Sequence, residues 1–323
     1  MTISPKKSYI IQMMRGLAVI AVVFIHNTPA GLPQVFCRPF LNFCVGLFLF
    51  LSGMLSNAGN WRPMKRVIKV AIPYVIWTLI YVVLHNHNDP LQIPKTFIRQ
   101  LITGQAAAMM YYVFVYCELT LLIPLIDKLA RSKYRWLGFL ISPIEILFMR
   151  TIPRLLGVGV NAYVEMIMGV SCIGWFIYFY LGYLLGNGLI GIRASTPKLI
   201  TALVISVFLQ IAEGYIFYTA GVGNCGTQMK LSAVLTGCIF TVLVFRYTES
   251  ENVPEVKALF VLGECSFGIY FSHMAIMSLL NMIPHYSERV FYPANAIIAL
   301  LASLCFVLAG KKIMGRSGRY LAF

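Results

Sequence analysis

Residues 9–27, YIIQMMRGLAVIAVVFIHN, form an apolar run of membrane-spanning length that contains two titratable side chains, Arg15 and His26. A helix needs about 20 predominantly apolar residues to cross a bilayer, and a polar group inside it costs several kcal/mol unless a partner or a water-filled cavity receives it. Eleven positions at about 100° each return to nearly the same direction, so both side chains lie on one helix face, about 16 Å apart along the axis. The stretch predicts a first transmembrane helix with a functional face.

The composition of the whole chain is that of a polytopic membrane protein. Of its 323 residues, 59% are hydrophobic and only 11% are charged, and the mean hydropathy is +0.79. Such values exclude a soluble globule with a charged shell. Because no long loop or internal repeat is evident, we expect an all-α fold with a single membrane domain over residues 1–323.

Apolar runs predict a transmembrane helical bundle of about ten spans, with both termini cytoplasmic. The expected spans are 9–27, 39–56, 68–84, 108–126, 136–150, 166–187, 199–217, 230–246, 258–280 and 294–310. The segment 94–108 is expected to be an amphipathic or re-entrant piece. In this topology 18 of the 26 Lys and Arg residues are cytoplasmic, seven lie on the other side and one lies within the first span, as the positive-inside rule requires. The net charge of +15 therefore indicates orientation in the plasma (inner) membrane and attraction to anionic lipids, and not nucleic-acid binding.

Neither a metal site nor a nucleotide site is predicted. His85 and His87 form a pair of potential ligands without a third, which is typical of a polar loop. No Walker or dinucleotide fingerprint is present, which argues against ATP-driven transport and hydride chemistry. Cys37 and Cys225 are both expected on the outer side, where a disulfide is allowed, although their spacing does not establish a pairing.

Small and polar residues within the expected spans have packing interpretations as well as functional ones. Ser52 lacks the setting of a nucleophile elbow, so we interpret Ser52-Gly53 as a place of close helix packing, and Gly182 with Gly186 as another. Ser266, Tyr270 and His273 share one helix face at i, i+4 and i+7. This face lines the same cavity as His26 in one interpretation and contains a core histidine in the other.

A series of short motifs in order along the chain resembles the acyltransferase 3 family of integral-membrane acyltransferases. They are MRGL (14–17) with ten residues between Arg15 and His26, FLSG (50–53), the basic run 62–69, PYVIW (73–77), the aromatic span 111–124, YLGYLLG (180–186) and GECSFGIYFSH (263–273). The similarity covers about residues 9–280. Each motif alone is short, but together and on about ten spans they are fairly specific.

This resemblance implies transfer of an acyl group, commonly acetyl from acetyl-CoA, to a hydroxyl of a cell-envelope glycan or its lipid-linked precursor. The expected partners are then acyl-CoA, the glycan or lipid-linked sugar, and membrane lipids. Arg15 lies nearer the cytoplasmic start of the first span and His26 nearer its outer end. An arginine fork suits phosphate or carbonyl oxygen, and an imidazole suits removal of a proton from an acceptor hydroxyl. Both side chains also have a structural interpretation, as groups hydrogen-bonded to carbonyls of neighbouring helices.

Two further groups complete the candidate site. The cluster Arg62, Lys65, Arg66 and Lys69 resembles the family's cytoplasmic basic motif and is expected to bind the phosphates of CoA, although lysine replaces the second arginine in either register. A pure orientation signal is the alternative. Glu118, in the middle of the fourth span, is expected to orient His26 or pair with Arg15; a structural ion pair fits equally well.

A proton-coupled secondary transporter of a small solute is the competing function. Buried Arg, His and Glu side chains in a ten-span bundle also suit such a carrier, but the repeated halves that carriers often have are not evident.

Overall fold

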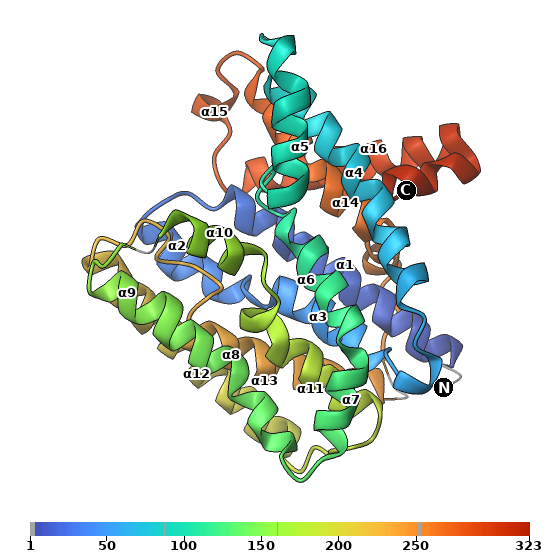
Figure 1. Ribbon diagram of the computed structural model, residues 1–323, viewed down its shortest axis with the longest axis vertical. Coiled ribbons are helices and arrows are strands. Elements are labelled where there is room, and N and C mark those ends of the chain that lie inside the picture. The colour runs from blue at the N-terminus through green and yellow to red at the C-terminus, as the bar shows by residue number, and fades with distance from the viewer. Residues whose placement is uncertain (1–3, 87, 160, 251–252) are drawn as a thin grey trace.

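The computed structural model describes residues 4–86, 88–159, 161–250 and 253–323, which form helices and connecting turns without a strand (Figure 1). The all-α fold class is confirmed; His87 lies outside the described residues. The helices are α1 (Pro5–Asn27), α2 (Leu32–Cys37), α3 (Phe43–Met54), α4 (Pro63–His85), α5 (Ile93–Thr103), α6 (Tyr111–Leu121), α7 (Ile123–Arg131), α8 (Ile141–Glu145), α9 (Ile152–Leu155), α10 (Ala162–Val170), α11 (Phe176–Gly186), α12 (Thr196–Thr219), α13 (Leu231–Thr248), α14 (Lys257–Asn281), α15 (Tyr286–Arg289) and α16 (Ala294–Met314). Figure 1 shows α4 and α5 on the opposite side of the molecule from α12 and α13.

Seven helical segments in the described part of the chain are long and apolar enough to cross a membrane. They are Pro5–Asn27, Leu32–Met54, Pro63–His85, Thr196–Thr219, Leu231–Thr248, Lys257–Asn281 and Ala294–Leu321. An eighth arises if α10 and the helix Ile173–Gly186, which meet at 43°, form one bent span. The protein is therefore a multi-pass membrane protein, whereas the count of ten and the cytoplasmic termini stay predictions.

The expected span 108–126 is broken into α6 and α7 at a proline, whereas the span 136–150 becomes α-helical only at Ile141 and continues into α9 through a π-helical segment, Ile146–Thr151. Pro124 lies in the first turn of α7 and Pro153 in the first turn of α9, while Pro143 lies inside α8. Proline lacks the backbone N–H that a continuing helix donates, so it begins a helix more readily than it extends one. The segment 94–108 contains α5, which has no buried residue, ends at Gly104 with φ +68° and fits the amphipathic expectation.

Glycines bring two pairs of helices into backbone contact. A Cβ added at Gly16 of α1 would overlap the Leu259 carbonyl of α14, and one added at Gly263 would overlap the Gln12 carbonyl of α1. Gly53, Gly182 and Gly186 join α3 to α11 in the same way, since their added Cβ atoms would overlap carbonyls at positions 179, 50 and 54. The predicted packing role of Gly53, Gly182 and Gly186 is confirmed, and the contacts of Gly16 and Gly263 were not predicted. Close contact between α1 and α14 places the Arg15 and His26 face of α1 beside Ser266, Tyr270 and His273.

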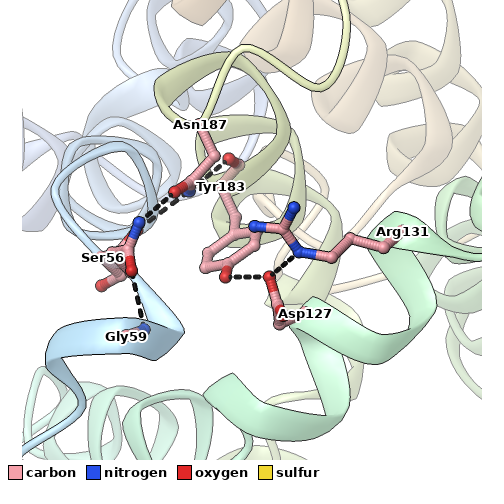
Figure 2. Close-up of polar contacts among 7 residues, drawn as sticks. Ser56, Gly59, Asp127, Arg131, Tyr183 and Asn187 are labelled. Atoms are coloured by element: carbon pink, nitrogen blue, oxygen red, sulfur yellow. Dashed lines mark hydrogen bonds and ion pairs between the residues drawn. The ribbon is translucent and has the colours of Figure 1, made fainter.

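We call the end of the bundle where α1 begins the near end, and the end where α1 finishes the far end. A polar network at the near end joins α3, α7 and α11 (Figure 2). The Tyr183 hydroxyl donates to Asp127 at 2.6 Å, Arg131 pairs with the same carboxylate at 2.8 Å, and the Asn187 amide donates to the Ser56 carbonyl at 3.0 Å. This network fixes the turn after α3, from which α4 and its basic residues continue.

Candidate active site

Three cavities follow one another through the interior of the bundle. The first, which we call the basic pocket, has a volume of about 670 Å³ and is lined by Lys65 and Lys69. It shares Arg15 with the second, the Arg15 cavity, of about 230 Å³. The third, the His26 cavity, of about 340 Å³, shares Tyr270 with the second. Because neighbouring cavities share lining residues, the series leads from the basic pocket to His26.

Arg15 belongs to the walls of two cavities. It lines the basic pocket and the Arg15 cavity, the latter together with Tyr112 and Tyr116 of α6. None of the described residues accepts a hydrogen bond from it or forms an ion pair with it. A guanidinium has five donors that stabilise a structure only when they are matched by acceptors. Arg15 therefore lacks the carbonyl contacts that its structural interpretation requires and is available to a ligand.

His26 lies beside a second histidine, His273 of α14, with ring centroids 5.3 Å apart. The His273 Nδ1 atom is 3.1 Å from the Ile269 carbonyl and 2.8 Å from the Tyr270 carbonyl. Both carbonyls accept, so Nδ1 carries the proton and Nε2 is left as an acceptor, which is buried and has no partner among the described residues. The neighbour of His26 is thus held in one orientation by its own helix.

Tyr270 forms the wall between the Arg15 cavity and the His26 cavity. Its hydroxyl donates to the Met109 carbonyl, and its ring lies 5.4 Å from the ring of Tyr112. Of the face predicted from spacing, Ser266 and Tyr270 both line cavities of the series, while His273 contacts His26 directly. Ser266 and Tyr270 thus belong to the cavity walls, whereas His273 is fully buried and lines none of these cavities, as the core-histidine interpretation expects.

The predicted basic cluster divides into two pairs with different surroundings. Lys65 and Lys69 line the basic pocket. Arg66 instead donates to Ser56 Oγ at 2.7 Å and to the Leu55 carbonyl at 3.2 Å, and so holds the connection between α3 and α4. Arg62 is exposed at the residue that precedes α4. Only the two lysines lie where a ligand of the cavity series would meet them, and their role in binding acyl-CoA stays a prediction.

Glu118 lies away from the two residues that it was expected to contact. One of its carboxylate oxygens accepts the backbone N–H of Cys172 at 2.7 Å, which ties α6 to the segment between α10 and α11. In the described part of the chain it forms no ion pair with Arg15, and it does not line the cavities that contain Arg15 or His26. A catalytic role for Glu118 stays an untested prediction, and its observed contact is structural.

Four residues of the cavities were missed by the sequence reasoning: Tyr112, Arg319, Arg38 and Arg150. Tyr112 lines the Arg15 cavity, Arg319 lines the basic pocket, and both Arg38 and Arg150 line the His26 cavity. The arginines carry the signal that identified Arg15, a charge next to apolar sequence, but were counted only as loop charges. Cys37 and Cys225, for which a disulfide was allowed, are both free thiols in the structure.

An all-helical bundle with cations and histidines around neighbouring cavities is typical of a membrane-embedded enzyme or carrier. A family model described as an acyltransferase domain matches residues 8–310, nearly the whole chain. The chain therefore belongs to the acyltransferase 3 family, and the resemblance of its motifs is confirmed. No curated protein and no solved structure matches it. Family and fold together make it a multi-pass membrane acyltransferase.

Proposed function

We propose that this protein transfers an acetyl group from acetyl-CoA to a hydroxyl of a cell-envelope glycan or lipid-linked sugar, in the plasma (inner) membrane. One observation carries the proposal: the cavity series that begins between Lys65 and Lys69 and ends at His26. An elongated donor with phosphates at one end and a thioester at the other matches such a series. The phosphates lie in the basic pocket, and the thioester reaches the His26 cavity.

The separation of Arg15 from His26 defines the part that each plays. The two side chains are about 16 Å apart along α1, because the helix rises about 1.5 Å per residue. Arg15 therefore contacts the arm of the donor, through a phosphate or carbonyl oxygen, and not the reacting carbonyl. It aligns the arm so that the thioester lies near His26, which places the reactants close together in the orientation that reaction requires.

His26 acts as the general base at the reacting carbon. The hydroxyl oxygen of the acceptor attacks the thioester carbonyl carbon, the C–S bond breaks, and the acetyl group ends as an ester on the acceptor. The hydroxyl proton passes to His26 and then to the sulfur of the departing CoA. His273, whose protonated Nδ1 is bound to two carbonyls, keeps its Nε2 lone pair directed away from those carbonyls and fixes the position of the neighbouring ring.

Acetyl-CoA turnover by the purified protein tests this function. We expect wild-type protein in detergent to release CoA thiol and label an envelope glycan extract from radiolabelled acetyl-CoA. His26→Ala should lower the rate by about 10² to 10⁴, the usual loss for a general base. The matched control is His285→Ala, since His285 is an exposed histidine paired with Glu288 outside the cavities.

Retained turnover in His26→Ala would contradict the proposed base. If liposomes that contain the protein took up a solute while the thioester of acetyl-CoA stayed intact, the protein would be a transporter and not an acyltransferase.

A further inference from the structure

The His26 cavity contains two arginines that the acyl donor does not account for. Arg38 and Arg150 line the same space of about 340 Å³ as His26. In the proposed function the donor phosphates lie in the basic pocket, at the other end of the cavity series. Positive charge within an apolar bundle is costly and marks a binding site when it faces a cavity.

Arg38 is a cation without a carboxylate partner in the described part of the chain. Its Nη1 donates to the Asn224 side-chain oxygen at 2.7 Å and its Nη2 to the Ile25 carbonyl at 3.3 Å, both neutral acceptors. Its Nε is buried and has no hydrogen-bond partner among the described residues. A buried, unmatched donor of a charged group is expensive unless a ligand supplies the acceptor.

Arg150 has a carboxylate partner, whereas only neutral acceptors receive hydrogen bonds from Lys230 and Arg38 in the described part of the chain. Arg150 pairs with Glu145 at 2.8 Å, and both side chains are only 10% exposed. Lys230 donates to the Gln210 carbonyl at 2.8 Å, and Glu213 accepts from the Ser232 backbone and hydroxyl. Arg38 thus supplies uncompensated positive charge next to His26.

The loop around Gly226 packs closely against the Arg38 side chain. A Cβ added at Gly226 would lie 2.6 Å from Arg38 Cδ and 2.7 Å from Gln34 Cβ, so only glycine leaves room for the arginine side chain there. The same loop contributes Thr227 and Gln228 to the cavity wall. Hydroxyl and amide groups of this kind suit the neutral hydroxyls of a sugar.

We infer that the acceptor sugar carries an anionic group, a carboxylate or a phosphate, which Arg38 binds while the reacting hydroxyl faces His26. The inference rests on the proposed function and adds the chemical class of the acceptor. An arginine fork binds either oxyanion through paired, charge-assisted hydrogen bonds. A carboxylate identifies an acidic sugar, and a phosphate identifies a phosphorylated or lipid-linked one.

Three small acceptors test the inference, which share their 2-, 3- and 4-hydroxyls and differ in the group on C5: methyl β-glucoside with a neutral hydroxymethyl, methyl β-glucuronide with a carboxylate, and methyl β-glucoside 6-phosphate with a phosphate ester. We expect wild-type protein to acetylate at least one anionic probe with a KM at least tenfold below that of the neutral probe. Arg38→Gln should raise that KM to the neutral value while kcat stays near wild type. Whichever anionic probe has the lower KM identifies the source of the negative charge.

Asn224→Asp provides a second variant that preserves the packing around Arg38. It places a carboxylate where Arg38 now donates to an amide, so the preference for anionic probes should disappear in a folded protein. Arg99→Gln is the control, because Arg99 is an exposed arginine of α5 and does not line the His26 cavity. Equal KM values for all three probes in wild type, or an unchanged preference in both Arg38→Gln and Asn224→Asp, would overturn the inference.

Thermal shift with the same probes separates this inference from the proposed function. If no probe is acetylated, stabilisation of wild type by an anionic probe, absent in Arg38→Gln and present in Arg99→Gln, still supports the anion site. Absence of that stabilisation overturns it.

Discussion

Replacement of Arg15 by lysine separates ligand binding from structural support at the centre of the cavity series. Lysine keeps the positive charge but has no planar fork, so it loses paired hydrogen bonds to a phosphate or carbonyl oxygen. In the described structure the Arg15 guanidinium makes no hydrogen bond, so no native hydrogen bond is lost. Loss of a hydrogen bond to a charged group costs about 1.5 to 3 kcal/mol. That range corresponds to about a 10-fold to 150-fold fall in kcat/KM, at 1.36 kcal/mol for each factor of ten.

Arg66→Lys is the matched control, because the Arg66 guanidinium donates hydrogen bonds within the protein and lines none of the three cavities. It donates to Ser56 Oγ and the Leu55 carbonyl, and it does not line the basic pocket. We expect Arg66→Lys to lower the melting temperature and to leave kcat/KM per folded molecule nearly unchanged.

Both variants are compared with wild type in detergent by acetyl-CoA turnover and by thermal unfolding. Arg15→Lys should show wild-type stability with reduced kcat/KM. Reduced stability and activity in parallel, or wild-type activity, would refute the assignment of Arg15 to the donor.

Other consequences of the structure are open to similar tests. Replacing Lys65 and Lys69 together by Gln should raise the KM for acetyl-CoA, and Arg62→Gln should leave it unchanged; equal effects would reduce the lysines to an orientation signal. Gly263→Ala should destabilise the protein by about 1 to 3 kcal/mol in thermal unfolding, because its methyl group meets the Gln12 carbonyl. Tyr270→Phe keeps the ring but removes one of the two donors to the Met109 carbonyl, which keeps the Tyr112 backbone N–H at 3.1 Å, so a loss of about 0.5 to 1.5 kcal/mol in stability should exceed any loss in kcat; a larger effect on kcat would assign the hydroxyl to catalysis.

Local periodicity explains why the face of α1 was predictable. Arg15 and His26 belong to one uninterrupted helix, so their relative direction depends only on helix geometry. The glycine contacts of α3 with α11 were predictable for a similar reason, since a small residue in an apolar span permits close approach.

The residues that surround Arg15 and His26 come from distant parts of the chain, so helix geometry does not predict them. Glu118 was expected near Arg15, but its carboxylate meets the backbone N–H of Cys172, 54 residues further on. Arg38 enters the His26 cavity because the turn at its own position and the loop around Gly226 come together. The spacing of residues within one helix does not predict which distant segments of the chain come together. Apolar run length alone extends the fourth expected span to residue 126, although Pro124 lies in the first turn of a new helix, α7.

In the proposed function the acyl group enters through the basic pocket and leaves at His26, at opposite ends of the bundle. Reconstitution in liposomes tests it directly, with radiolabelled acetyl-CoA outside and a membrane-impermeant envelope glycan either trapped inside or added outside. Only molecules whose basic pocket faces outward meet the donor. We expect labelled glycan in the lumen, no label on external glycan, and no luminal label with His26→Ala. Labelling of external glycan at the luminal rate, or luminal labelling that survives in His26→Ala, would contradict this expectation.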